Sequence, residues 1–582
     1  MHGGMKIYVG SPAAARNYVE ADRSRADDYY LAEGTGVAEW YVASPDAAVR
    51  RMSPLSGEGY EAWVAGVDPD IGMAKGRLRN DDRAVRFVEM IVNGPKSWSL
   101  AAELHPDISA AYEAAQERAA MQIIAWLARH ATTRVGPRRG QVQVPVEEIE
   151  AVTVRHFTSR AGDPHRHLHL QINARMFAAG QWRGLHTVGV RDSLGAINGI
   201  GHAAVATDPQ FRAALAAHGF GLDGVGEIVQ LAPFVGAFSQ RAAQIERNIE
   251  RYEADWTATH PGEQPGPALR RAWDARAWAE GRPDKVIPEP GANVHGRWLT
   301  ELADLGYRDR GKPIHLRTTQ VGAVDREQAT DLVLARLAAG RSAWNAADIR
   351  GEVEQFIAGE GVVVDAAIRG ELAEDLTDRV LERCVPLLPR DGVPEHIRAL
   401  TSAHVLDVER EITGRLAVRG AEPGRDVDLS RVALVGEMTG RCLDIGQCDV
   451  VAALVGDRSL IVVEGAAGAG KTTTLSATRD LLAAQGRRMT VVTPTLKAAK
   501  VAQAEIGTLA GSARWLAFEH GWRWDAHGTW RRLAPGEFDP VTGRNYVGPV
   551  ERATLRAGDL LIVDLCRHRD YAEQRELRFA VA

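Results

Sequence analysis

The chain has 582 residues, of which 45% are hydrophobic and 25% are charged. These values exclude the disordered, collagen-like and coiled-coil classes, and at about 150 residues per domain the length predicts roughly three to four domains. The net charge of -6 excludes a protein that binds nucleic acid through bulk charge alone. No apolar run approaches the roughly 18 residues that a membrane-spanning helix needs, and the N-terminus lacks a signal-peptide pattern. We therefore expect a cytoplasmic protein that does not insert into a membrane.

Three tyrosines with polar neighbours lie near the N-terminus: Tyr18, Tyr29 and Tyr30. One interpretation is ordinary packing in a core or on a surface. The other is a nucleophile, but a phenol with a pKa of about 10 is ionised in only about one molecule in a thousand at neutral pH. A tyrosine nucleophile would therefore need a cation or a base beside it.

A local excess of positive charge follows. Between Arg118 and Arg191 the sequence has eleven arginines and four acidic residues. Such a concentration is either a solvated face or a surface that binds a polyanion. Arg160, Arg166 and Arg175 are candidate phosphate contacts by position, and Trp182 is either a core residue or a base-stacking one.

A predicted β-hairpin lies inside this basic region. Residues 152–157 and 165–173 alternate between apolar and polar side chains, and loop residues 158–164 separate them. The alternation places His165, His167 and His169 on one strand face, and pairing across the hairpin brings His156 beside them. A solvent-exposed polar face is the simpler alternative. Clustered imidazoles repel when protonated, however, and a bound metal removes that cost. We therefore predict a catalytic metal site whose open positions accept a phosphodiester.

The middle of the chain carries no chemical signature. Two Pro/Gly-rich segments, 261–267 and 282–290, predict the end of the first domain. Beyond them, residues 326–339 and 346–357 show apolar residues at three- and four-residue spacing, which predicts amphipathic helices.

The last part of the chain contains a phosphate-binding motif. Residues 460–464 form a short apolar strand, and Gly465 to Thr472 match G-x-x-x-x-G-K-[ST] ahead of a predicted helix. Backbone amides in such a loop hold phosphates, the lysine meets the terminal phosphates and the threonine holds Mg. The predicted nucleotide-binding residues of this motif are Gly465, Gly468, Gly470, Lys471, Thr472 and Thr473. A parallel α/β fold is expected around them.

Taken together, these motifs resemble one known family. Tyr18, Pro95-Lys96-Ser97 and His156-x10-His167-x-His169 look like the relaxases of the MobF type, the TraI/TrwC group of plasmid conjugation. The resemblance covers about residues 5 to 300 and continues into the ATPase part. It implies site- and strand-specific nicking of DNA by a tyrosine, through a 5′-phosphotyrosyl intermediate with a free 3′-hydroxyl, and rejoining by the reverse reaction.

The same resemblance implies roles for particular residues. The metal ligands fall on His156, His167 and His169, whereas His165 has no ligand counterpart. The first catalytic tyrosine falls on Tyr18 and the second pair on Tyr29 and Tyr30. A carboxylate that steadies a metal histidine or helps to deprotonate the tyrosine falls on Glu89. The family is usually described with Mg or Mn, while three imidazoles favour Zn, Mn or Ni over Mg, so we expect a divalent cation of open identity.

For the ATPase part, the resemblance is to superfamily 1 helicases. Gln447 falls on the adenine-reading glutamine, and Asp564 on the Mg-associated aspartate that ends a strand. Leu565 stands where the family has a glutamate that positions the attacking water. We expect ATP with Mg to bind but the helicase to be incomplete, because the chain lacks room for a second motor domain. For Trp515, Trp522, Trp524 and Trp530 we expect core packing, with stacking on single-stranded DNA as the alternative.

The predicted architecture thus has three parts. An α+β relaxase domain with an antiparallel sheet and a histidine metal site spans residues 1–300, a mainly helical connecting region spans 301–430, and a partial α/β P-loop (RecA-like) domain spans 431–582. The expected partners are single-stranded DNA at a transfer origin and accessory relaxosome and coupling proteins. The alternative function is a DNA- and ATP-binding remnant without nicking activity.

Overall fold

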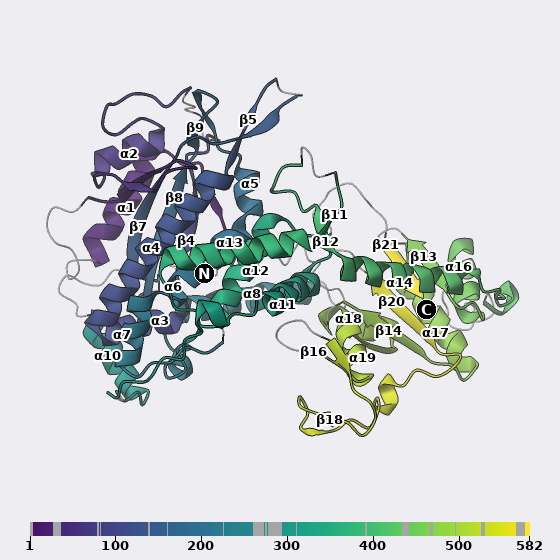
Figure 1. Cartoon of the computed structure of the whole chain (residues 1–582). Coiled ribbons are helices and arrows are strands. Elements are labelled where there is room, and N and C mark those ends of the chain that lie inside the picture. Colours follow the sequence, from purple (N-terminus) through teal and green to yellow (C-terminus); the bar gives the residue numbers. More distant parts are fainter. Residues whose placement is uncertain are drawn as a thin grey trace. The chain divides into compact units, whose positions relative to one another are not determined.

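The histidine-bearing hairpin forms the middle of an antiparallel sheet in the computed structural model (Figure 1). The structure describes residues 4–26, 36–77, 81, 83–137, 140–159, 161–224, 226–259, 273, 276–277, 294–309, 311–389, 393–432, 442–465, 469–494, 496–524, 530–565 and 577–581. The chain forms two units, which are described separately. The first comprises Met1–Asn248 and Arg276–Ser402, and the second comprises Ile249–Ala275 and Ala403–Ala582.

The sheet of the first unit has the strand order β1-β4-β8-β7-β2-β3, and all neighbouring pairs are antiparallel. Its strands are β1 (Lys6–Tyr8), β2 (Glu39–Ala43), β3 (Arg50–Arg51), β4 (Phe87–Val92), β7 (Ile149–Thr158) and β8 (Pro164–Asn173). The two longest strands, β7 and β8, are the predicted hairpin, and they occupy the interior of the sheet. The expected antiparallel sheet is therefore confirmed.

Helices cover both faces of this sheet. Successive strand residues point to opposite faces, so Leu168, Leu170 and Ile172 join one core while Val152 and Val154 join the other. The first core packs against α3 (Lys96–Leu104), α4 (Pro106–His130) and α6 (Leu194–Ala206). The second packs against α1 (Pro12–Ala26) and α2 (Gly57–Ala65). The odd-numbered histidines of β8 lie on the face that α1 and α2 cover.

Shorter elements surround the sheet. They are β5 (Thr132–Val135), β6 (Val142–Pro145), β9 (Arg175–Ala178), β10 (Gln181–Gly184), α5 (Thr187–Asp192), α7 (Pro209–Ala217), η1 (Ala232–Phe234), α8 (Gln240–Thr259), which ends in the second unit, and α10 (Val294–Asp304). Strands β5 and β6 pair with each other, as do β9 and β10.

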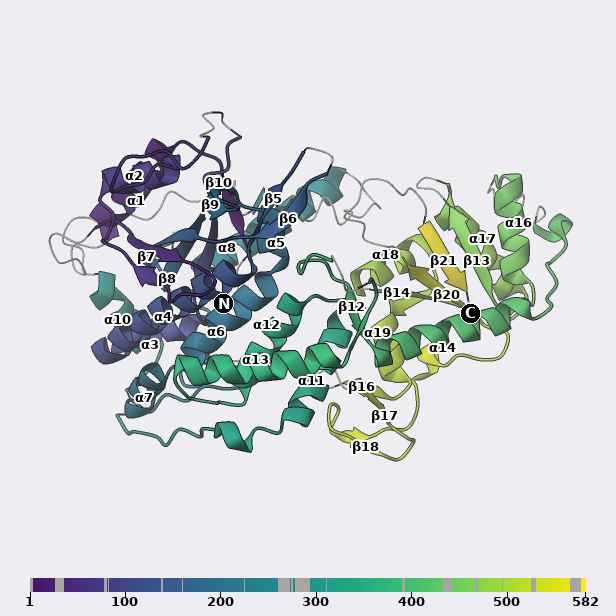
Figure 2. The same ribbon diagram turned by 45° about the horizontal axis from the view of Figure 1, so that its top comes forward.

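The predicted middle helices are confirmed and belong to the first unit. They are α11 (Arg326–Gly340), α12 (Ala346–Gly359) and α13 (Ala366–Glu382), preceded by η2 (Val321–Ala323) and followed by the paired strands β11 (Cys384–Pro386) and β12 (Leu400–Ser402). Helix α12 lies against α6 (Figure 2). A Cβ on Gly199 would lie 2.6 Å from the Gly351 carbonyl oxygen, so the two helix backbones touch where only glycine fits.

In the second unit, a five-stranded sheet has the order β13-β21-β20-β14-β15. Strand β14 pairs in parallel with β15 and with β20, as the α/β prediction requires, whereas β21 runs antiparallel between β13 and β20. The strands are β13 (Ile461–Gly465), β14 (Met489–Thr493), β15 (Leu509–Ser512), β20 (Leu560–Leu565) and β21 (Leu577–Val581).

Helices and small hairpins complete this unit. The helices are α14 (Ala403–Ala421), α16 (Ile445–Val455), α17 (Lys471–Ala484), α18 (Leu496–Ile506), α19 (Ala513–Glu519) and η3 (Glu551–Ala553). The hairpins are β16 (Trp522–Trp524) with β17 (Trp530–Arg532), and β18 (Phe538–Asp539) with β19 (Arg544–Asn545). Apolar side chains of α16, α17, β14 and β20 form its core.

The end of the first domain was predicted from two segments that the structure does not describe. The Pro/Gly-rich segments 261–267 and 282–290 lie outside the described residues, so the domain boundaries drawn from them stay predictions. Among the helices that the structure describes, we find none long and apolar enough to cross a membrane.

Candidate functional site

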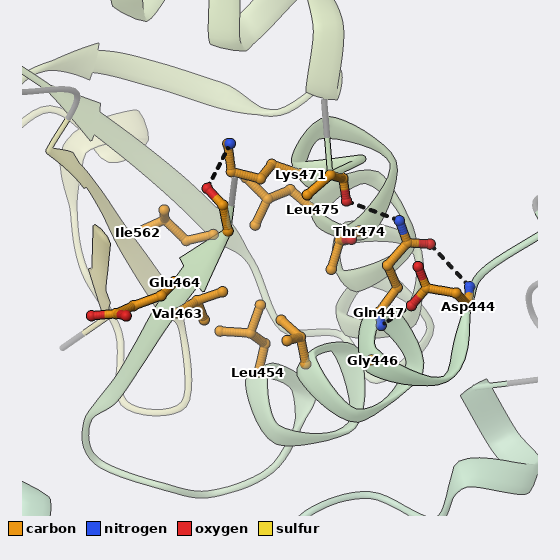
Figure 3. A pocket seen from close by; sticks show the side chains of 13 residues that line it. Asp444, Gly446, Gln447, Leu454, Val463, Glu464, Lys471, Thr474, Leu475 and Ile562 are labelled. Carbon is orange, nitrogen blue, oxygen red and sulfur yellow. Dashed lines mark hydrogen bonds between the residues drawn. The ribbon is translucent and has the colours of Figure 1, made fainter. Parts of the chain in front are cut away.

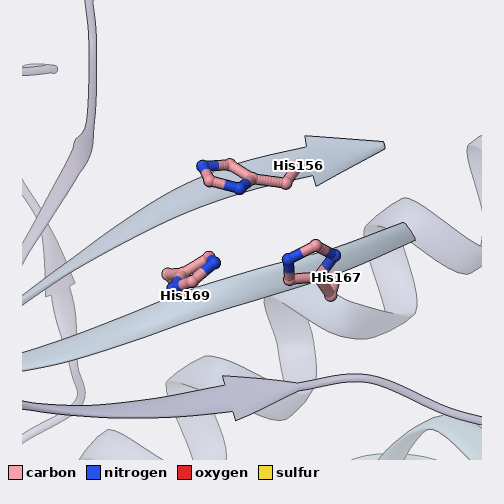
Figure 4. Close-up of side chains that lie close together, drawn as sticks. All are labelled: His156, His167 and His169. Atoms are coloured by element: carbon pink, nitrogen blue, oxygen red, sulfur yellow. The ribbon is translucent and has the colours of Figure 1, made fainter. Parts of the chain in front are cut away.

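Strand register brings three histidines together on one sheet face. In the β7–β8 pairing, His156 lies directly opposite His167, and His169 follows two residues along β8 on the same face. The three imidazoles face one another in Figure 4. One nitrogen from each ring can be chosen so that all three lie within 4.8 Å of one another. Three such donors on two paired strands can hold one divalent cation.

An oxygen atom lies beside Nδ1 of each of the two β8 histidines in this cluster. The Nδ1 of His167 lies 2.7 Å from the His165 carbonyl oxygen, and the Nδ1 of His169 lies 3.2 Å from Oε2 of Glu89. A ring that donates Nδ1–H to an oxygen, as His167 can to the His165 carbonyl, keeps the lone pair of Nε2 for a metal. His165 itself stacks on His167 at 4.5 Å between ring centroids but is not one of the three converging donors.

Burial favours the neutral form of two histidines on β8, His165 and His167. Desolvation, followed by the neighbouring histidines, holds the pKa of His167 well below its usual value. Desolvation also lowers the pKa of His165 to about 3. Metal ligation requires the neutral ring, so His167 is in its metal-binding form at neutral pH.

Glu89 connects the histidines to a second layer of polar groups. Its burial opposes ionisation, but the hydrogen bond and charge of His169 outweigh burial, so the pKa of Glu89 lies below its usual value. Gln171 donates Nε2–H to Glu89 at 2.9 Å, and Tyr60 donates its hydroxyl to Oε1 of Gln171 at 2.8 Å. The sequence analysis missed Gln171 and Tyr60. Gln171 continues the alternate positions of the β8 histidines, which was the available signal.

Tyr18 lies beside this cluster. It is on α1, its ring centroid is 6.3 Å from that of His156, and 43% of the residue is exposed. An exposed phenol next to a cation site can reach a substrate that arrives from solvent. Tyr29 and Tyr30 lie outside the described residues.

The structure contradicts one of the DNA contacts that were predicted from position in the sequence. Arg166 is 1% exposed, and its guanidinium is paired with the carboxylates of Glu103 and Glu113, so the structure contradicts a role in binding phosphate. A charge at a buried strand position needs such partners. Arg160 lies outside the described residues. Trp182 packs with its ring 5.3 Å from Nζ of the buried Lys75.

The second unit contains the P-loop site (Figure 3). A cavity of about 370 Å³ lies between β13 and the helices α16 and α17. Lys471 begins α17 and donates Nζ–H to the Gly465 carbonyl oxygen at 3.1 Å. Gly470, with φ of +71°, turns the chain into that helix. Gly468 lies outside the described residues.

The predicted adenine-reading glutamine closes one side of the same cavity. Gln447 and Asp444 cap α16 reciprocally, and Gln447 also donates Nε2–H to the Ala469 carbonyl oxygen at 3.0 Å. Thr472 contacts Glu505 at 3.3 Å, and Thr473 is exposed in the first turn of α17. Asp564 lies on β20; its side chain is outside the described part of the chain.

Two family models match the chain. The TrwC relaxase family model matches residues 12–305, and an AAA domain model matches residues 442–577. No curated protein matches the chain. Solved structures that resemble it include the metal-bound conjugative relaxase TrwC in complex with oriT DNA, 21% identical, with a TM-score of 0.40 over 52% of this chain and 99% of that one.

A second solved structure, TrwC complexed with a 27-mer DNA comprising the recognition hairpin and the cleavage site, is 19% identical, with a TM-score of 0.37 over 52% of this chain and 99% of that chain. The TrwC family model alone spans half of the 582 residues, from the first residue of α1 to just past α10. The chain therefore belongs to the TrwC relaxase family.

Proposed function

We propose that this relaxase cuts and rejoins one DNA strand at a specific site, with Tyr18 as the nucleophile and a divalent cation held by three histidines. The proposal rests on one observation: His156, His167 and His169 converge beside an exposed tyrosine. The substrate class is single-stranded DNA at a transfer origin. Accessory relaxosome and coupling proteins are expected partners through the family resemblance alone.

The donor set suits such a cation. Two of the rings have Nδ1 beside an oxygen acceptor, and burial favours the neutral form of His167. A cation held by His156, His167 and His169 supplies positive charge to a phosphate oxygen and to a nearby phenolate. Three imidazoles favour Zn, Mn or Ni over Mg, whereas the family is usually described with Mg or Mn, so the identity of the cation stays open.

The residues of the chain then have distinct tasks. The Tyr18 oxygen, after loss of its proton, bonds to phosphorus while the bond from phosphorus to the 3′ oxygen breaks, and the departing oxygen takes up a proton. The products are a 5′-phosphotyrosyl enzyme and a free 3′-hydroxyl, and the reverse reaction rejoins the strand. Glu89 contacts His169 and Gln171, which supports a role in orienting the metal ligand.

For the second unit we propose that it binds ATP with Mg and hydrolyses it slowly. When ATP binds, Nζ of Lys471 contacts phosphate oxygens in place of the Gly465 carbonyl oxygen. Gln447 lines the same cavity. The reason for slow hydrolysis is Leu565, an apolar residue directly after Asp564 where superfamily 1 members have the water-positioning glutamate.

Covalent adduct formation tests the nicking proposal. Full-length protein is mixed with single-stranded oligonucleotides tiled across the DNA that flanks the gene, with and without Mn, and separated on a denaturing gel. We expect a metal-dependent band shift that Tyr18→Phe abolishes, because the substitution removes the attacking oxygen.

Tyr8→Phe is the matched control. This substitution also removes a phenolic hydroxyl, one that donates to the Ser11 carbonyl oxygen. We expect the adduct yield of the Tyr8→Phe variant to equal that of the unchanged protein. If no tile gives an adduct while the fold and metal binding are intact, the chain is a DNA- and ATP-binding protein without nicking activity.

A further inference from the structure

An aromatic face lies on the small hairpin β16–β17 of the second unit. In the register of this hairpin, Trp524 pairs with Trp530, and Trp522 pairs with Arg532. Directly opposed residues point to the same side of a β-ribbon, and residues two apart on a strand do so as well. Trp522, Trp524, Trp530 and Arg532 therefore share one face, which we call the tryptophan face.

On the opposite side of the ribbon, Arg523 faces the protein, whereas its cross-strand neighbour Arg531 is exposed. Arg523 is 5% exposed, and its guanidinium is paired with Asp539. On the tryptophan face, by contrast, Trp522 is 38% exposed and Trp530 is 48% exposed. The core packing expected for these two tryptophans is therefore wrong. Two large apolar rings are therefore exposed to solvent.

The three rings pack against one another at an angle, tilted in one pair and edge-to-face in the other. The ring centroids of Trp524 and Trp530 are 4.8 Å apart, and those of Trp522 and Trp530 are 6.5 Å apart. Arg514, at the start of α19, lies with its guanidinium carbon 4.0 Å from the ring centroid of Trp524. The Arg514 guanidinium thus lies over the face of the Trp524 indole in a cation–π contact.

The charge of the face selects the partner. Two arginines supply positive charge at the tryptophan face. Arg532 lies on it by strand register, Arg514 contacts the Trp524 ring, and both are exposed. Aromatic rings that accept unpaired bases, beside cations that accept phosphates, are the combination found on surfaces that bind single-stranded nucleic acid. Stacking is tolerant of sequence because every base has a π-face.

We propose that the tryptophan face binds single-stranded DNA by base stacking, independently of DNA sequence. This surface is distinct from the histidine site, lies in the other unit, and does not depend on Tyr18 or on the bound cation. It gives the second unit a DNA contact of its own. The strand bound there has no requirement for the sequence that is cut.

Photo-crosslinking of the full-length chain tests the proposal. The probe is an oligonucleotide of thymidines in which single positions carry 5-iododeoxyuridine, a base that crosslinks to nearby aromatic side chains. We expect mass spectrometry to locate crosslinks at Trp522 and Trp530. Because the crosslink reports position, DNA bound by the first unit does not obscure the result.

Substitution supplies the second readout. We expect the double change Trp522→Ala and Trp530→Ala to abolish the crosslinks in the hairpin and to lower the affinity of that site at least about tenfold, because two stacking surfaces are removed. The double change to Phe keeps two rings and should retain most of the binding. Phe538→Ala removes an exposed aromatic side chain elsewhere in the same unit and should change nothing.

Three results would overturn the proposal. The first is an absence of crosslinks in β16 and β17 at saturating DNA. The second is unchanged affinity in the double alanine variant, with circular dichroism showing an intact fold. The third is a change in oligomeric state without a change in DNA binding, which would assign the tryptophan face to contacts between copies of the chain. Adduct formation through Tyr18 continues in each case if the nicking proposal is correct.

Discussion

The two candidate sites are built in opposite ways. The histidine site stands on two long, buried, paired strands, and the register of those strands brings its donors together. The P-loop site stands on a loop and the first turn of a helix, and its lysine is bonded to the protein's own backbone. A ligand of the first site completes an existing arrangement, whereas a ligand of the second must replace internal hydrogen bonds. Strand register therefore sets the geometry of the first site before a ligand binds, whereas the second site must rearrange its hydrogen bonds when a ligand binds.

Removing one histidine should have the largest effect. His167→Ala takes one of three donors from a rigid set that cannot rearrange to replace it, and we expect metal affinity and adduct yield to fall at least about a hundredfold. Isothermal titration with Mn and the adduct gel measure the two effects. The control is His130→Ala, where the lost imidazole contacts Glu395 and lies outside the site. Unchanged Mn affinity in the His167 variant would remove these histidines from the metal site.

Removing the P-loop lysine should affect the second unit alone. We expect Lys471→Ala to weaken ATP binding by about tenfold or more, because the terminal phosphates lose a positive charge. A fluorescent ATP analogue measures the affinity, and the adduct gel should show unchanged nicking. Lys500→Ala removes an exposed lysine from α18 as the control. Rapid ATP hydrolysis by the unchanged protein would contradict the role assigned to Leu565.

A milder change tests how much the first site depends on its support. Glu89→Gln keeps the side-chain length but removes the charge beside Nδ1 of His169. We expect Mn affinity to fall by about tenfold, because the histidine is held and polarised less strongly. Glu147→Gln is the control, since the Glu147 carboxylate accepts a hydrogen bond from the Ala179 backbone far from the ligands. A full loss of adduct with normal Mn affinity would instead assign Glu89 to the chemistry at Tyr18.

Period-two alternation predicted from sequence that His165, His167 and His169 share one strand face and that His156 lies beside them. The choice of His156, His167 and His169 as metal ligands came from the family resemblance. The P-loop spacing placed Lys471 at the start of a helix. Sequence could not show that Arg166 is paired with Glu103 and Glu113, because those partners lie 63 and 53 residues away. It also could not tell the exposed face of a short ribbon from its buried one. The exposure of Trp522 depends on Arg523 turning inward to meet Asp539.

The glycine contact between α6 and α12 limits how far the relaxase part of the chain can be truncated. The family match ends at residue 305, yet Gly351 rests against Gly195 and Gly199 from beyond that point. A fragment that stops after α10 would leave the glycine side of α6 in water. A minimal relaxase fragment should therefore run through β12, to Ser402, and limited proteolysis should release a stable piece of that length before any shorter one.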